Sequence, residues 1–259
     1  MRPLETLRAD TPHGELVLQL RGGARPGAAL FLAGSILMDS DLAASERELA
    51  RRGLAALEEA RQSDGAPGGE ARESGDGPGE AMGGAPRRAR GCSVLVAGLG
   101  LGLTLEELLS LRGVGRIEVV EIFAPLVDWN RGPLAPLNGR ALADPRVGVR
   151  VGDLREFLEA DLRGAARYDL LLLDIDNGPT WLSLAGNSWL YEREGLERLR
   201  AHTAPRGVIA FWATEASAPF EDVLRRTAWG AWRRETIRCP LGDGQRVLEY
   251  TLYLLRLRA

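Results

Sequence analysis

Residues 94–104 read Val-Leu-Val-Ala-Gly-Leu-Gly-Leu-Gly-Leu-Thr, and this stretch decides the fold. Its apolar start predicts a buried strand, its alternating glycines (Gly98, Gly100 and Gly102) predict a tight turn, and the leucine-rich segment that follows predicts a helix. Thr104 and Glu107 have the spacing of a capping box for that helix. Glycines at such a turn let the main chain approach a ligand closely and leave helix amides pointing at it. We therefore expect a ligand at this turn, although a glycine turn without a ligand remains an alternative.

The spacing of the glycines narrows the class of ligand. A dinucleotide fingerprint needs glycine at position 103, where this chain has Leu103, so NAD is disfavoured. The observed G-x-G-x-G pattern suits S-adenosylmethionine-type nucleosides better.

From residue 92 onward, apolar runs alternate with amphipathic segments, which is typical of βαβ units and a parallel sheet. Two β-rich runs at the end predict an antiparallel hairpin. We predict an α/β fold with a doubly wound, mostly parallel seven-stranded sheet, a class I methyltransferase-like Rossmann fold. Its expected strands are residues 92–97, 116–122, 147–151, 168–174 and 207–213, with the hairpin at 234–239 and 246–257.

The first part of the chain reads differently. Residues 15–21 and 30–38 predict a β-hairpin, and residues 41–60 predict a helix. Residues 61–91 contain nine glycines and no Val, Ile, Leu or aromatic residue, which predicts a disordered Gly/Pro-rich insert. We divide the chain into an N-terminal hairpin and helix (1–60), the insert (61–91) and a nucleoside-binding domain (92–259).

Composition excludes several function classes. All 33 basic residues are Arg, the only histidines are His13 and His202, and the only cysteines are Cys92 and Cys239. Lysine bases, zinc sites and Ser-His-Asp catalysis therefore have almost nothing to be built from. The net charge of −3, with charges interspersed, argues against nucleic acid or a membrane surface as partner. No signal peptide or membrane span is evident, and we expect the protein in the cytoplasm.

Acids stand at the ends of the second and third predicted strands. Glu121, followed by Ile122, lies 23 positions after Gly98, where a carboxylate can bind both ribose hydroxyls. Asp153, followed by Leu154, can accept a hydrogen bond from the adenine amino group. Asp153 can equally be the N-cap of the helix that starts at Leu154.

The fourth predicted strand, in residues 168–179, delivers Asp174 and Asp176 to the carboxyl edge of the sheet, where open α/β sheets bind ligands. In extended chain the two share a face, and their like charges can raise one pKa and make a base. With no usable His or Lys, a carboxylate is the natural acceptor of a proton from a substrate ammonium. The alternatives are a solvated loop acid with an Asx-turn, or a magnesium site; we predict no metal.

Three further residues are candidates for binding a small amine substrate: Asn177, Trp189 and Tyr191. Aromatic faces hold cations well, although packing is the alternative role for each ring. Trp212 is interpreted as a packing residue.

Residues 94–102, 118–130, 144–157, 168–179 and 190–211 together resemble the spermidine synthase (aminopropyltransferase) family and its bacterial paralogues. The resemblance implies that Glu121 holds ribose, Asp153 holds adenine and Asp174 deprotonates the attacking amine. It implies aminopropyl transfer from decarboxylated S-adenosylmethionine to an amine, as in polyamine biosynthesis. A homodimer is also suggested, because family members are often dimers.

Two departures keep other functions open. The family usually has an acid at the position of Leu101, where it contacts the ammonium of the donor, and its second acid after the fourth strand falls at Asn177. Asp176 is the acid available instead. Intact S-adenosylmethionine as donor, for methyl or aminocarboxypropyl transfer, and a non-catalytic nucleoside-binding protein are therefore alternatives.

Overall fold

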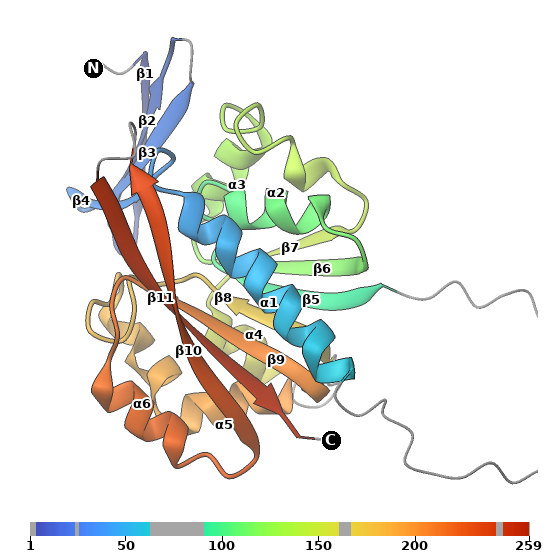
Figure 1. Ribbon diagram of the computed structural model, residues 1–259. Coiled ribbons are helices and arrows are strands. Elements are labelled where there is room, and N and C mark those ends of the chain that lie inside the picture. The colour runs from blue at the N-terminus through green and yellow to red at the C-terminus, as the bar shows by residue number, and fades with distance from the viewer. Residues whose placement is uncertain (1–3, 24–25, 63–90, 161–166, 242–245, 259) are drawn as a thin grey trace, which may run out of the picture.

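A mixed sheet forms the centre of the computed structural model, which describes residues 4–23, 26–62, 91–160, 167–241 and 246–258 (Figure 1). Within these residues the sheet has seven strands in the order β10-β11-β9-β8-β5-β6-β7. All neighbours are parallel except β11, which is antiparallel to both β9 and β10. The predicted fold class is confirmed. The strands are β5 (Cys92–Ala97), β6 (Val114–Glu121), β7 (Val147–Val151), β8 (Tyr168–Leu173), β9 (Thr203–Ala213), β10 (Gly230–Leu241) and β11 (Arg246–Leu257).

Strand order reverses at β5, which pairs with β6 on one side and with β8 on the other. The connections from these strands leave the sheet in opposite directions, so a crevice opens at their carboxyl ends, where α/β proteins bind ligands. The glycine turn follows β5 and Asp174 follows β8, which places both at this crevice.

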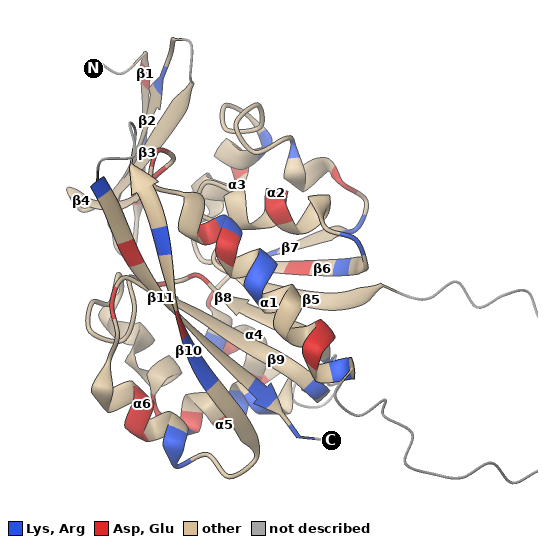
Figure 2. Cartoon of the chain, viewed as in Figure 1, with Lys and Arg blue, Asp and Glu red and all other residues tan. Residues whose placement is uncertain are grey.

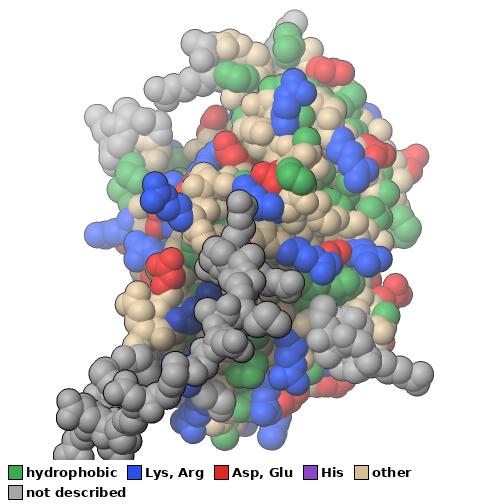
Figure 3. Space-filling model, turned by 90° about the vertical axis from the view of Figure 1, so that its right-hand side faces the viewer, with side chains coloured by type: hydrophobic (Ala, Val, Ile, Leu, Met, Phe, Trp, Pro, Cys, Tyr) green, Lys and Arg blue, Asp and Glu red, His purple; other side chains and the backbone are tan. Residues whose placement is uncertain are grey.

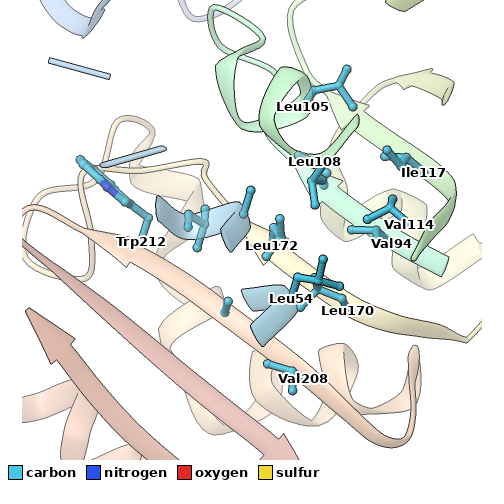
Figure 4. Packing of buried hydrophobic residues seen from close by; sticks show 14 of the residues in the cluster. Leu54, Val94, Leu105, Leu108, Val114, Ile117, Leu170, Leu172, Val208 and Trp212 are labelled. Carbon is cyan, nitrogen blue, oxygen red and sulfur yellow. The ribbon is translucent and has the colours of Figure 1, made fainter. Parts of the chain in front are cut away.

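Helices cover both faces of the sheet because side chains alternate along each buried strand. Leu170 and Leu172 of β8 share a core with α1 and α2, whereas Leu171 and Leu173 share a core with α4, α5 and α6. Figure 4 shows Leu54 of α1 beside Leu170. The helices are α1 (Ala44–Gln62), α2 (Leu103–Ser110), α3 (Ala124–Arg131), α4 (Leu154–Ala160), α5 (Arg193–Ala201) and α6 (Ala218–Arg225), with 3-10 turns η1 (Ala141–Ala143) and η3 (Ala185–Tyr191).

The N-terminal part is a four-stranded antiparallel sheet rather than the predicted hairpin: β1 (Glu5–Thr11), β2 (Gly14–Arg21), β3 (Gly27–Leu32) and β4 (Ser35–Asp39). The run at 30–38 is two strands because a turn at Ala33 and Gly34, both with positive φ, reverses the chain. Prediction missed β1, whose alternating exposed and half-buried residues give only a weak pattern. Leu16, Leu18 and Leu30 pack against the region of the glycine turn.

Helix α1 belongs to the core of the large sheet. Leu49 and Leu57 lie in the same apolar cluster as Val94 and Leu172. Ion pairs join α1 to α2, with Arg47 at 2.6 Å from Glu106 and Arg51 at 2.8 Å from Glu107, and Figure 2 shows basic and acidic residues along the helix. This packing holds the N-terminus of α1 at the carboxyl edge of the sheet.

Three further predictions concern the insert, the surface charge and the absence of a membrane span. Residues 63–90 lie outside the described residues, so the insert and the domain division at 60 and 91 stay predictions. On the face seen in Figure 3, basic and acidic side chains are interspersed. No helix in the described residues is long and apolar enough to cross a membrane.

Candidate functional site

A pocket lies at the carboxyl edge of the sheet, where the glycine turn, the ends of β6 and β8, the start of α1 and the η3 segment meet. It contains about 950 Å³ of space, part of which is open to solvent. Among the described residues, no Arg or His lines it, whereas five carboxylates do: Glu46, Glu121, Asp153, Asp174 and Asp176. Such a wall favours cationic ligands, because it carries negative charge that no basic side chain of the lining offsets.

The predicted site residues converge at this pocket. Those that line it are Gly98, Gly100, Glu121, Ile122, Asp153, Leu154, Asp174, Asp176, Asn177 and Trp189. Gly102 and Tyr191 lie just outside the lining, and their roles as ligand contacts stay predictions. The roles assigned to the other residues are predictions as well.

The glycine turn has the left-handed conformation that only glycine adopts without strain. Gly98, Gly100 and Gly102 have φ of 90°, 52° and 81°. A Cβ at Gly98 would lie 2.1 Å from the carbonyl oxygen of Asp174, so the absence of a side chain allows the turn to contact the end of β8. Asn130 donates from Nδ2 to the carbonyl oxygen of Gly100 at 2.9 Å and holds the turn from beneath.

The predicted capping box at Thr104 and Glu107 is wrong. Gly102 is the N-cap of α2 and supplies no side-chain bond. Thr104 instead donates from Oγ1 to Asp174 Oδ2 at 2.9 Å, and Glu107 pairs with Arg51. Two longer-range partners thus replace the local exchange of hydrogen bonds that the motif suggested.

Glu121 is 5% exposed and is held by main-chain amides. Its Oε2 accepts a hydrogen bond from the amide of Leu99 at 2.8 Å, and its Oε1 accepts one from Phe123 at 2.8 Å. Burial raises the pKa of Glu121, while these amides act in the opposite direction. The carboxylate therefore fixes the glycine turn to the end of β6. Glu121 also lines the pocket, and its role in binding ribose stays a prediction.

Asp153 makes the helix-capping bond that was one of its two predicted roles. Its Oδ1 accepts a hydrogen bond from the amide of Arg155 at 2.6 Å, in the first turn of α4. The residue also lines the pocket. Capping is thus observed, and adenine binding stays a prediction that is compatible with it.

The acid whose charge acts on Asp174 is not Asp176, the one that the sequence predicted. The chain bends after β8, so Asp174 and Asp176 have separate sets of partners. The acid whose charge interacts with Asp174 is Glu46, the third residue of α1. Burial raises the pKa of Asp174 to about 6, and burial together with the charge of Asp174 raises the pKa of Glu46 to about 7. Two carboxyl groups in this pocket thus titrate near neutral pH.

Asp176 is 5% exposed and is anchored through its Oδ1 atom. Its Oδ1 accepts hydrogen bonds from the amide of Ser183 at 2.8 Å and from Asn187 Nδ2 at 3.0 Å. Its Oδ2 has no hydrogen-bond partner among the described residues. Burial raises the pKa of Asp176. A buried carboxylate oxygen without a partner is a natural contact for a donor group of a ligand.

The two aromatic residues predicted to bind the amine have different surroundings, and their binding roles stay predictions. Trp189 lines the pocket. Tyr191 packs edge-on against Phe220, with ring centroids 5.3 Å apart, and burial together with the charge of neighbouring Asp176 raises the pKa of the Tyr191 hydroxyl. Trp212, interpreted from sequence as a packing residue, does pack against Tyr250, with the two rings tilted by 34°. It also lines the pocket, and its buried Nε1 has no hydrogen-bond partner among the described residues.

Sequence reasoning missed Glu46 and Trp212. A signal for Glu46 exists: it lies four positions before Ala50 and seven before Gly53, on the face of α1 that is otherwise apolar. For Trp212 no local signal exists, because its neighbours Phe211 and Ala213 are equally buried and its exposure to the pocket depends on where β9 ends.

Part of the chain is similar in sequence to curated aminopropyltransferases. Polyamine aminopropyltransferase 2 of Pseudomonas aeruginosa is 34% identical over 128 residues, which are 48% of this chain and 34% of the relative. The polyamine aminopropyltransferase of Pyrobaculum calidifontis is 30% identical over 116 residues, 45% of this chain and 39% of the relative. The predicted resemblance to the aminopropyltransferases is confirmed.

The similarity to aminopropyltransferases covers only part of their length, and the chain is also similar to enzymes of another kind. The matched segment spans only about a third of the length of these curated relatives. Putrescine N-methyltransferase 3 of Nicotiana tabacum is also similar, with 32% identity over 118 residues, 45% of this chain and 28% of the relative. No family model matches the chain.

Solved structures extend the likeness of fold over almost the whole chain. A spermidine synthase in complex with the transition-state analogue AdoDATO matches with a TM-score of 0.65 and 16% identity, covering 98% of this chain and 73% of that one. Spermidine synthase from Thermotoga maritima matches with a TM-score of 0.62 and 15% identity, over 98% and 72%. At these identities the likeness concerns the fold, including the N-terminal sheet.

Proposed function

We propose that this protein transfers an aminopropyl group from decarboxylated S-adenosylmethionine to a small amine. The observation that carries the proposal is the pocket lining, with five carboxylates and no basic side chain among the described residues. The sulfonium of the donor and the ammonium groups of donor and acceptor are all cations, so such a lining complements them. The aminopropyltransferase relatives support the same reaction.

In the proposed reaction, Asp174 accepts a proton from the ammonium of the acceptor. The nitrogen lone pair then attacks the methylene carbon of the aminopropyl group that is bonded to the sulfonium and forms a carbon–nitrogen bond. The bond between that carbon and sulfur breaks, and its electron pair stays on sulfur to give 5′-methylthioadenosine. Asp174 suits this role because its pKa of about 6 leaves it ionised at neutral pH yet more basic than an ordinary carboxylate. We assign the ribose to Glu121, the adenine to Asp153, and the amine to Asp176, Asn177 and Trp189.

A second candidate is methyl transfer from intact S-adenosylmethionine to an amine. Two observations favour it: the similarity to putrescine N-methyltransferases, and the position of Leu101, whose fully buried side chain lies in the apolar cluster of the N-terminal sheet. The glycine turn thus presents no acid to select a donor that lacks the carboxylate.

One experiment separates the two. The purified protein is incubated with decarboxylated or intact S-adenosylmethionine and a panel of diamines and monoamines, and the nucleoside product is identified by mass spectrometry. Formation of 5′-methylthioadenosine from the decarboxylated donor supports aminopropyl transfer, and S-adenosylhomocysteine from the intact donor supports methyl transfer. Absence of both products with every amine contradicts both candidates.

A further inference from the structure

Glu46 is a buried acid in the pocket, and it comes from the N-terminal part of the chain. It is 6% exposed, lines the pocket together with Asp174, and sits in the first turn of α1. Ser45 donates a hydrogen bond from its hydroxyl to Glu46 Oε2 at 2.7 Å. The neighbouring Arg47 is directed elsewhere and pairs with Glu106 at 2.6 Å. A buried carboxylate without a salt bridge is costly for the fold, so its place in a pocket wall calls for an explanation.

The start of α1 and the end of β8 meet through Thr104. Its hydroxyl lies 2.9 Å from Asp174 Oδ2 and 3.3 Å from the carbonyl oxygen of Glu46. The two carboxyl groups are close enough that the charge of Asp174 is, after burial, the main cause of the raised pKa of Glu46. They therefore titrate as a pair.

The other titratable groups that face Glu46 change little near neutral pH. Burial and the charge of Glu46 raise the pKa of Tyr250 on β11 to about 12. Burial and the charges of Glu46 and Glu48 raise the pKa of the Cys239 thiol on β10. Both groups are neutral at pH 7. Arg47 is paired with Glu106. Near neutral pH the protons that change the charge at this place are therefore those of Glu46 and Asp174.

Two more groups in the same wall indicate a polar ligand. Asp176 Oδ2 and Trp212 Nε1 both belong to residues less than a tenth exposed, both residues line the pocket, and neither atom has a hydrogen-bond partner among the described residues. Buried polar atoms are seldom left without partners, so a ligand, or water that a ligand displaces, is expected to meet them.

We propose that Glu46 is a specificity-determining ligand of the acceptor amine. Glu46 and Asp174 form a carboxyl pair that binds one ammonium group of the amine. Before the amine binds, the pair shares a proton, and the ammonium displaces this proton. Asp176, through its free Oδ2, receives the other ammonium of a diamine. The inference rests on the proposed amine substrate. The protonated amine keeps its own proton on binding, and the proton lost by the carboxyl pair passes to the buffer.

The release of a proton on binding of the amine can be measured without turnover. Putrescine is titrated calorimetrically into the protein saturated with 5′-methylthioadenosine at pH 6.5, in buffers of low and high ionisation enthalpy. We expect the wild type to release a fraction of a proton per amine bound. We expect Glu46→Gln to lose at least half of this release and to bind putrescine at least tenfold more weakly, because a charge-assisted contact is removed.

The control is Glu48→Gln, on the same helix, since Glu48 pairs with Arg51 and Arg52 and does not line the pocket; it is expected to match the wild type. Glu46→Asp keeps an acid on a shorter side chain, so it is expected to weaken binding of putrescine while the proton release persists. This variant tests the inference if Glu46→Gln does not fold. Unchanged affinity and proton release in Glu46→Gln, or no binding of putrescine to the wild type, overturns the inference. Binding with proton release but without transfer to any amine leaves the inference standing and refutes the proposed function.

Discussion

The hydroxyl of Thr104 donates a hydrogen bond of 2.9 Å to Oδ2 of Asp174. It joins the first turn of α2, directly after the glycine turn, to the first residue after β8. The hydrogen bond thus connects the part of the pocket predicted to hold the nucleoside to the carboxylate predicted to accept the proton. A change at Thr104 is expected to alter the protonation of Asp174 while leaving the carboxyl groups of Glu46, Asp174 and Asp176 in the pocket.

Replacing Thr104 with Val tests this link. The hydrogen bond lowers the pKa of Asp174, against the larger effect of burial. Its loss is expected to raise that pKa further, so the acid limb of the pH profile of kcat/KM moves to higher pH. Thr104→Ser, which keeps the hydroxyl, is expected to retain the wild-type profile. An acid limb that stays in place in Thr104→Val argues against Asp174 as the titrating base.

Asp174→Asn removes the proposed proton acceptor while preserving its shape. We expect kcat to fall by roughly 10²- to 10⁴-fold, the usual contribution of a positioned general base, with little change in nucleoside affinity measured by calorimetry. Asp169→Asn is the matched control, because Asp169 lies near the opposite end of the same strand, where it accepts a hydrogen bond from the amide of Ser93 at 2.8 Å. Equal losses in the two variants point to damage to β8 rather than to catalysis.

Gly98→Ala tests the close approach at the glycine turn. Gly113→Ala is its control, because Gly98 and Gly113 have similar φ, +90° and +82°, so both variants carry the same kind of backbone strain, on the order of 1–3 kcal/mol. A Cβ at Gly113 meets nothing within 4 Å, whereas one at Gly98 lies 2.1 Å from the carbonyl oxygen of Asp174. We expect Gly98→Ala alone to lose nucleoside binding, and to lower the urea midpoint more than its control. Equal effects of the two variants indicate that strain, not the contact with β8, sets the requirement for glycine.

The sequence predicted those features that follow from local pattern. Apolar runs such as that of β5 and the glycine turn after it specify strand, turn and helix over a dozen residues, and the topology then brings Asp174 to the turn. The partners of Thr104 and Asp174 were not predictable, because they come from elements far apart in the chain. For Glu46 the sequence indicates a place on the apolar face of its helix. The packing of α1 across β8 and β9, which places this side chain in a pocket built mainly from residues beyond 91, is not visible in the sequence.

The pH dependence of stability provides a last test, directed at Glu46. Its pKa is raised from 4.5 to about 7 in the folded protein, so the folded state binds more protons than the unfolded state between these values. The free energy of unfolding therefore falls as pH rises through this window, by about 3 kcal/mol for Glu46 at roughly 1.4 kcal/mol per unit of pKa. Burial of Asp174 acts with the same sign, since its pKa is raised from 3.8 to about 6.

Glu46→Gln removes the ionising group and keeps an acceptor for the Ser45 hydroxyl. It is expected to be more stable than the wild type at pH 8 and to differ less from it at pH 5, as measured by urea unfolding at both values. Glu48→Gln is expected to keep the wild-type dependence in this window, because Arg51 and Arg52 lower the pKa of Glu48, whose titration then lies at more acidic pH. A drop between pH 5 and 8 in Glu46→Gln as large as that of the wild type contradicts the assignment. A smaller drop in Glu46→Gln than in the wild type means that ionisation of Glu46 lowers the stability of the folded wild type. A cation that binds between Glu46 and Asp174 is then expected to raise stability at pH 8 in the wild type and not in Glu46→Gln.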